Sequence, residues 1–215
     1  MDSAVLLLPF ILSTLVSTTL SLSCTECSGE KPCQGPSVTC PTDFDACVAT
    51  LESTTKDGKE VQLYSQHCGK KDICSYSGSL TTDHGVKNVS STCCFTNNCS
   101  PSKPTFPARK TDKNGVSCKA CSAEKEKTCE PSTTIECIGD ENSCVTMTIE
   151  TKEPTSYSSF RGCGTQGWCK VKEREFMSEG KTTEIEIVCN GGNAALPLSL
   201  PLTLLAALSI IRVVY

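Results

Sequence analysis

Cysteine is the residue type with the clearest chemistry in this chain, which has 18 cysteines among its 215 residues. A cysteine sulfur can bind zinc as a thiolate or join a second cysteine in a disulfide. Cys24-x2-Cys27 and Cys118-x2-Cys121 have the spacing of zinc ligands, but no companion Cys-x2-Cys accompanies either pair. The even count favours disulfides made in an oxidising compartment. We therefore expect structural disulfides, and neither a metal site nor a cofactor.

Patterns for catalysis and for nucleic-acid binding are missing from the sequence. His67 and His84 are the only histidines, and neither lies in a Gly-x-Ser-x-Gly, His-Glu-x-x-His or phosphate-binding glycine motif. The formal net charge is -4, and the sequence has no basic cluster of the kind that binds nucleic acid. We expect a protein that is not an enzyme and has no nucleic-acid partner.

The cysteines form two runs with nearly the same spacing. Ten lie in Cys24–Cys99 and eight in Cys118–Cys189, and eight positions of the two runs agree in spacing to within two residues. Duplication of one domain explains this agreement. We predict a first domain over residues 22–100 and a second over residues 115–190. Residues 101–114 carry three prolines and are predicted to be a semi-rigid spacer, with the domains either packed together or strung along the chain.

The segments between the cysteines alternate polar and apolar residues, as half-buried strands do. The alternation is clearest in Val48–Leu51, Val61–Tyr64 and Glu184–Val188. Turn formers at Lys56–Lys59 and Glu153–Thr155 separate such stretches, so each long interval between cysteines is predicted to be a hairpin. No segment between the two chain ends has a sustained helical period. The predicted fold class is all-β, with two tandem small disulfide-rich domains.

Both ends of the chain carry targeting patterns. Residues 1–21 hold an apolar run followed by small residues, which is typical of a signal peptide; the run is short for the alternative, a membrane-spanning helix. Residues 191–215 combine small residues with a hydrophobic tail, which favours a glycosylphosphatidylinositol (GPI) anchor signal over a single-pass helix. Asn190 and Asn193 are the candidate lipidation residues, and the sequence leaves the choice open. We expect the protein on the outer leaflet of the plasma membrane, with secretion as the alternative.

The order of the cysteines carries a family resemblance. The first domain opens with Leu22-Ser23-Cys24-Thr25-Glu26-Cys27 and closes with Cys93-Cys94-Phe95-Thr96-Asn97-Asn98-Cys99. This order resembles the three-finger (LU) family of lymphocyte antigen 6 and urokinase receptor domains. The resemblance spans nearly the whole mature chain and implies two palms of disulfides, each with three projecting hairpin fingers.

Spacing alone leaves the connectivity of the cysteines open. The resemblance implies the pairs Cys24–Cys47, Cys27–Cys33, Cys40–Cys68, Cys74–Cys93, Cys94–Cys99, Cys118–Cys144, Cys121–Cys129, Cys137–Cys163 and Cys169–Cys189. The second domain departs from the family pattern, because it has no counterpart of Cys94 and Cys99.

Two kinds of surface residue are candidates for function. Asn88-Val89-Ser90 is a sequon for N-glycosylation on the predicted third finger of the first domain. Aromatic side chains anchor many protein interfaces, although a domain poor in aromatics also needs them for its own core. Trp168, next to Cys169, is interpreted as packing within its palm. The candidate ligand contacts are Tyr64, Tyr76, Tyr157 and Phe160.

These features predict a GPI-anchored cell-surface binding protein of the receptor, adhesion or cell-recognition type. It would hold an extracellular protein ligand through its fingers or through the cleft between its domains. The alternative is an extracellular inhibitor of a secreted enzyme such as phospholipase A2, because two-domain members of the family that it resembles include serum proteins that block this enzyme.

Overall fold

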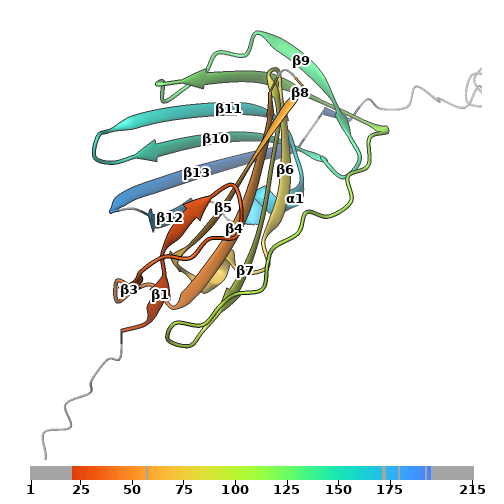
Figure 1. The fold of residues 1–215 in the computed structure, drawn as a ribbon. Coiled ribbons are helices and arrows are strands. Elements are labelled where there is room, and N and C mark those ends of the chain that lie inside the picture. Colours follow the sequence, from red (N-terminus) through yellow and green to blue (C-terminus); the bar gives the residue numbers. More distant parts are fainter. Residues whose placement is uncertain (1–20, 57, 171–172, 179, 192, 195–215) are drawn as a thin grey trace, which may run out of the picture.

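The computed structural model describes residues 21–56, 58–170, 173–178, 180–191 and 193–194 (Figure 1). The regular structure in this part is almost entirely β, which confirms the predicted fold class. The first repeat contains β1 Ser23–Thr25, β2 Cys27–Gly29, β3 Ser37–Thr39, β4 Ala46–Lys56, β5 Lys59–Gly69, the 3-10 turn η1 Lys71–Ile73, β6 Ser77–Thr82 and β7 Gly85–Cys94. The second repeat contains β8 Lys113–Glu124, β9 Thr133–Ile138, β10 Ser143–Thr151, β11 Ser156–Gly164, α1 Gln166–Lys170, β12 Glu173–Ser178, β13 Lys181–Gly191 and β14 Asn193–Ala194.

Long antiparallel hairpins form the fingers of each repeat. β4 and β5 pair along their whole length up to Lys56 and Lys59, where the sequence predicts a turn. β7 pairs with the other edge of β4, and β6 pairs with β7. In the second repeat β10 and β11 form a hairpin on either side of Glu153–Thr155, and β13 covers the other edge of β10. The turn residues of the sequence therefore set the register of the β4–β5 and β10–β11 hairpins.

Nine disulfides tie the fingers together at their bases. They are the same nine pairs that the family resemblance implies: Cys24–Cys47, Cys27–Cys33, Cys40–Cys68, Cys74–Cys93, Cys94–Cys99, Cys118–Cys144, Cys121–Cys129, Cys137–Cys163 and Cys169–Cys189. No cysteine in the described part of the chain, which includes all 18, is free. The sulfurs that cluster in the two palms are therefore bonded to each other and are not thiolates.

The two repeats share one sheet. β6 pairs with β11 through Thr81↔Cys163 and Leu80↔Gly164, so the strands follow one another in the order β12-β13-β10-β11-β6-β7-β4-β5-β2. Gly162 makes this approach possible, because a Cβ atom at that position would lie 1.9 Å from the carbonyl oxygen of Thr81. We call this contact the seam. The sequence leaves open whether the two domains pack together, and the seam shows that they do.

The largest hydrophobic cluster of the described residues lies on the inner face of the shared sheet and includes side chains from both repeats. Trp168 on α1 lies edge-on to Tyr76 of the first repeat, with 5.5 Å between the ring centroids. Trp168 is buried next to the Cys169–Cys189 bridge, as its interpretation as a packing residue predicts, but its packing also crosses the repeat boundary, because α1 packs against β6. The buried side chains of this core are Ala46, Val48, Ile73, Tyr76, Leu80 and Val89 from the first repeat and Val145, Met147, Phe160, Trp168 and Ile187 from the second.

Residues 101–114, the predicted spacer, lie along the outer side of the first repeat (Figure 1). Pro101 and Pro104 are buried, and Phe106 packs against the cluster formed by Ala49, Leu51 and Tyr64. β8 begins at Lys113, so the last residues of the predicted spacer already belong to the second repeat. The first half of the connecting segment thus packs on the first repeat, and the second half contacts the second repeat through the Lys110–Asp140 ion pair and the bond from Gly139 N–H to the carbonyl of Asp112.

The shared sheet curls, and the fingers of both repeats face a common concave side (Figure 1). Strands β10, β11 and β13 run across the direction of β4, β6 and β7, and the edge strand β12 comes back beside β5. Among the described helices, none has the length and apolar character needed to cross a membrane. The predicted signal peptide and most of the predicted anchor signal lie outside the described residues.

Candidate ligand-binding hollow between the repeats

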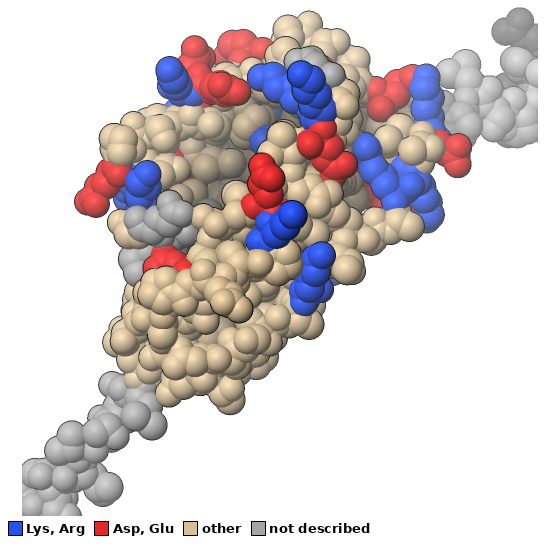
Figure 2. Space-filling view, in the orientation of Figure 1, with Lys and Arg blue, Asp and Glu red and all other residues tan. Residues whose placement is uncertain are grey.

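A hollow of about 610 Å³ lies where the fingertips of the first repeat meet β8 and β11 of the second. Figure 2 shows the concave side of the molecule hollowed, with charged side chains of both signs around it. Because its walls come from both repeats, neither repeat forms it alone. We call it the inter-repeat hollow and define it by Lys56, Lys87, Glu124, Lys125, Tyr157 and Phe160.

Sheet register brings Lys87 to this hollow. Lys87 on β7 lies opposite Leu80 of β6, and side chains of one strand alternate between the two faces, so Lys87 shares the inner face with Val89. Phe160 belongs to the core on the same face. The Nζ atom of Lys87 lies 4.3 Å from the centroid of the Phe160 ring. This is a cation–π contact between the repeats, at the floor of the hollow.

Burial lowers the pKa of Lys87 below its ordinary value, because an ammonium group that loses water loses stabilisation of its charged form. The carboxylates of Glu52 and Glu124 oppose this shift, and the charge of Lys56 adds to it. Glu124 also forms an ion pair with Lys56 at 3.6 Å, in which both side chains are mostly exposed. Water screens such a pair, so it fixes little in place.

Hydrogen bonds to β8 and β11 hold the rim of the hollow. Ser122 Oγ donates to Asp83 Oδ1 at 2.9 Å and lies 3.1 Å from Thr82 Oγ1, which joins β8 to the tip of the β6–β7 hairpin. Lys125 has a positive φ of 67°, and its backbone N–H donates to the carbonyl of Tyr157 at 2.7 Å. The rim is therefore held by side-chain bonds between the two repeats and by a backbone bond within the second repeat.

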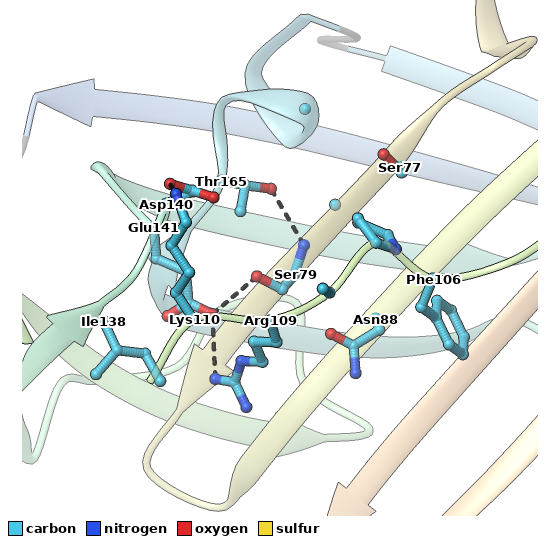
Figure 3. A pocket seen from close by; sticks show the side chains of 14 residues that line it. Ser77, Ser79, Asn88, Phe106, Arg109, Lys110, Ile138, Asp140, Glu141 and Thr165 are labelled. Atoms are coloured by element: carbon cyan, nitrogen blue, oxygen red, sulfur yellow. Dashed lines mark hydrogen bonds and ion pairs between the residues drawn. The ribbon is translucent and has the colours of Figure 1, made fainter. Parts of the chain in front are cut away.

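A buried carboxylate joins the repeats on the outer face of β6 (Figure 3). Glu141, in the turn between β9 and β10, is 2% exposed. Its Oε1 accepts hydrogen bonds from Ser79 Oγ at 2.8 Å, from Thr81 Oγ1 at 2.9 Å and from the Arg109 guanidinium at 3.2 Å. Asn114 Nδ2 donates to the backbone carbonyl of Glu141 at 3.1 Å. These bonds attach the second repeat and the connecting segment to β6, which fixes the angle between the walls of the hollow.

The candidate contact aromatics divide into two groups. Tyr64 is 3% exposed and Tyr76 is 6% exposed, so both rings belong to cores, and their proposed role as surface contacts is wrong. The physical reason is the scarcity of aromatics, at 5% of the chain, which commits large rings to burial. Phe160 and Tyr157 are among the residues that line the inter-repeat hollow, but Phe160 belongs to the shared core and the Tyr157 ring points to the other face of β11, beside Lys127. A contact role for either residue remains a prediction.

The candidate modification residues lie in strands. Asn88 is half-buried on the outer face of β7, where its Nδ2 donates to Ser53 Oγ at 3.0 Å. Figure 3 shows it beside Phe106 at a small cavity of about 150 Å³. Asn190 lies in β13 opposite Cys144, and Asn193 lies in β14 opposite Ser117. Glycosylation and lipidation at these residues remain predictions.

Sequence reasoning missed Lys87, Glu124 and Glu141. In the sequence, Lys87 and Glu124 stand among polar residues of hairpins, and Glu141 stands in a polar turn after Gly139. Each gains its neighbours only when the two repeats pack together. A local pattern therefore carries no signal for them.

The disulfide framework and the hairpin fingers define a tandem three-finger protein, and comparison with known proteins agrees. The family model for the u-PAR/Ly-6 domain matches residues 20–102 and 114–195, so the chain belongs to this family, with one domain per repeat. Phospholipase A2 inhibitor NAI from Notechis ater is 28% identical over 196 residues, which cover 88% of this chain and 95% of the inhibitor. The urokinase plasminogen activator surface receptor of Rattus norvegicus is 27% identical over 166 residues, which cover 73% of this chain and 47% of the receptor.

The chain thus spans about half the length of the urokinase receptor that it matches. Among solved structures, the crystal structure of mouse TEX101 overlaps 77% of this chain and 95% of TEX101 with a TM-score of 0.36 and 14% identity, an overlap too loose to bear on function. The relatives from Notechis ater and Rattus norvegicus are named as an inhibitor and as a receptor, and not as enzymes.

Proposed function

We propose that this protein is a GPI-anchored cell-surface binding protein that holds an extracellular protein ligand in the inter-repeat hollow. The observation that carries the proposal is the construction of the hollow from both repeats, with the seam on one side and Glu141 on the other fixing its walls. Walls that are already in place spare a ligand the entropic cost of ordering them. The names of the relatives, one a receptor and one an inhibitor, support a role in binding proteins.

The anchor is tested on cells that express the full-length chain. Treatment with bacterial phosphatidylinositol-specific phospholipase C should release the protein into the medium, because this enzyme cleaves the lipid of a GPI anchor. Mass spectrometry of the released C-terminal peptide should then identify the attachment residue. Asn193 is the better candidate, since attachment there keeps β13 whole through Gly191, whereas attachment at Asn190 removes the end of that strand and all of β14. Protein that stays on the cells after treatment contradicts the anchor.

The binding surface is tested by an extracellular interaction screen with two matched variants. Ser158 lines the inter-repeat hollow on the same face of β11 as Phe160, so Ser158→Trp fills part of the hollow and should abolish capture of ligands that the unchanged protein captures. Phe95→Ala removes a ring that is 53% exposed and outside the residues lining the hollow, so it should leave capture unchanged. The opposite pattern would place the ligand on the palm of the first repeat.

An inhibitor of a secreted phospholipase A2 is the second candidate function. It is favoured by the relative from Notechis ater, which aligns over 95% of its own length. The test is titration of the purified protein into an assay of secreted phospholipase A2. Inhibition in that assay, together with accumulation of full-length protein in the medium, would replace the anchored receptor by a secreted inhibitor.

A further inference from the structure

The inter-repeat hollow is positively charged in a negatively charged chain. The charged residues that line it are three lysines, Lys56, Lys87 and Lys125, and one glutamate, Glu124. The lining therefore carries an excess of positive charge, whereas the chain as a whole has a formal net charge of -4. A positively charged lining attracts negatively charged partners, even though the chain as a whole is negative.

Lys87 differs from the other lysines of the hollow. Lys56 is paired with Glu124, and both side chains are mostly exposed, whereas the ammonium group of Lys87 stands over the Phe160 ring on the inner face of the sheet. Its loss of water lowers its pKa despite the carboxylates of Glu52 and Glu124 nearby. A partly dehydrated ammonium group gains more from a new carboxylate than an exposed one does, because the effective dielectric constant around it is lower.

The surroundings of Lys87 also define the apolar part of a ligand. Phe160 lines the hollow beside it, whereas Tyr157 lies three positions earlier on β11 and its ring points to the other face of the strand. Tyr157 is half-buried and lies 5.8 Å from the Nζ atom of Lys127, and Phe160 is 9% exposed. A segment that places a carboxylate on Lys87 can therefore place a neighbouring aliphatic or aromatic side chain against the exposed edge of the Phe160 ring.

We propose that the inter-repeat hollow selects an acidic segment of an extracellular protein, and that Lys87 is the residue that determines this specificity. The segment carries an Asp or Glu side chain that pairs with Lys87, flanked by an apolar side chain that packs on the exposed edge of Phe160. This inference deepens the proposed binding function and rests on it.

The test uses protein produced in mammalian cells from the full-length chain, with three fluorescent peptides as probes. One short peptide alternates Glu with Leu and Tyr, and its two counterparts have Gln or Lys in place of every Glu. Fluorescence anisotropy at near-physiological salt should show the Glu peptide binding at least about tenfold more tightly than either counterpart. Equal binding of the Glu and Gln peptides, or binding of none, overturns the proposal.

Matched lysine variants identify the residue responsible. Lys87→Met should weaken binding of the Glu peptide by about tenfold or more, and Lys87→Arg should retain most of it, because the positive charge remains. Lys103→Met is the control, since Lys103 is exposed on the connecting segment and does not line the hollow. Equal affinities for Lys87→Met and Lys103→Met overturn the assignment. Circular dichroism of each variant shows that a lost affinity does not come from a lost fold.

A second experiment measures the reactivity of the Lys87 amine. Because burial lowers its pKa, Lys87 should react with a limiting amount of an acylating reagent ahead of exposed lysines, and the Glu peptide should protect it. Peptide mapping by mass spectrometry measures both effects.

Binding of heparin or of phosphatidylserine vesicles without any preference among the peptides would mean that the hollow takes polyanions and not a protein segment. If phospholipase C releases a protein that captures extracellular ligands regardless of Lys87, the proposed function stands and this inference fails.

Discussion

His67 makes the stability of the first repeat depend on pH. It lies on β5 opposite Val48 and is 5% exposed. Burial lowers the pKa of His67 from 6.5 to about 4, because the imidazolium would lose its hydration. Between these values the unfolded chain binds a proton that the folded protein does not bind. The contribution of neutral His67 to the unfolding free energy is therefore fully present above pH 6.5. It is lost as the pH falls toward about 4, by on the order of 3 kcal/mol over the whole window.

The first prediction is that His67→Gln removes this pH dependence. Unfolding in urea, with the disulfides intact, can be followed by the fluorescence of the single tryptophan, Trp168. Across the window from near-neutral pH to about pH 4, the unfolding free energy of the unchanged protein should fall more steeply than that of the variant. His84→Gln is the control, because the His84 side chain is 60% exposed. Equal slopes for the unchanged protein and His67→Gln would mean that His67 is not the titrating group.

The second prediction compares two disulfides of the first palm. Cys40–Cys68 joins residues 28 positions apart, and both are almost fully buried. Cys94–Cys99 closes a loop of sequence separation 5, and both are half-buried. Loop-closure entropy alone makes the longer link worth about 1.5 kcal/mol more. Replacing both cysteines by serine should therefore reduce secretion and the denaturation midpoint more for Cys40 and Cys68 than for Cys94 and Cys99. Equal losses would show that the small terminal loop is as important to the palm as the long link.

At the scale of elements, the seam between β6 and β11 depends on a missing side chain. Gly162→Ala places a Cβ atom 1.9 Å from the carbonyl oxygen of Thr81, so β11 must move away from β6. The third prediction is a loss of about 1–3 kcal/mol in unfolding free energy, measured by chemical denaturation. Gly29→Ala in β2 is the matched control, since its new Cβ would meet only Lys31 O at 3.7 Å. A Gly162→Ala protein as stable as the Gly29→Ala protein would show that the seam can open at little cost.

The fingers could be predicted from the sequence because their signals are local. Alternation in Val61–Tyr64 and the turn at Lys56–Lys59 lie within one hairpin, and β4 and β5 follow them. The family resemblance supplied what spacing could not, the pairing of the cysteines. The seam could not be predicted, because only two residue pairs form it and nothing in β6 marks it as a partner of the second repeat.

The residues of the candidate site also divide into those that the sequence could predict and those that it could not. Phe160 and Tyr157 could be named from their residue types, since aromatics are common at interfaces. Lys87 and Glu141 could not, because a lysine in a strand and a glutamate in a turn are ordinary surface residues until another domain covers them. Their roles arise from the packing of one repeat on the other, which involves contacts such as Ser79–Glu141 across 62 residues of sequence.

At the scale of the whole molecule, the two repeats share one core and should unfold as one unit. Tyr76 packs on Trp168, and the same cluster includes Val89 of the first repeat and Met147 of the second. A second repeat separated from the first would expose these apolar side chains to water, at roughly 25 cal/mol for each Å². The fourth prediction is a single calorimetric transition, with equal calorimetric and van't Hoff enthalpies, for the protein with intact disulfides.

Glu141 gives a sharper form of this prediction. Glu141→Gln keeps an oxygen that can accept from Ser79 and Thr81 but removes the charge that strengthens the bond from Arg109, so the single transition should move to lower temperature by an amount worth about 1 kcal/mol. Asp140→Asn is the neighbouring control, because Asp140 pairs with Lys110 in an exposed contact at 3.1 Å that contributes little. Equal shifts for both variants would mean that Glu141 contributes no more than the exposed pair. Two separate transitions in the unchanged protein would mean that the repeats fold independently. In that case the walls of the hollow would not be held in place before a ligand arrives.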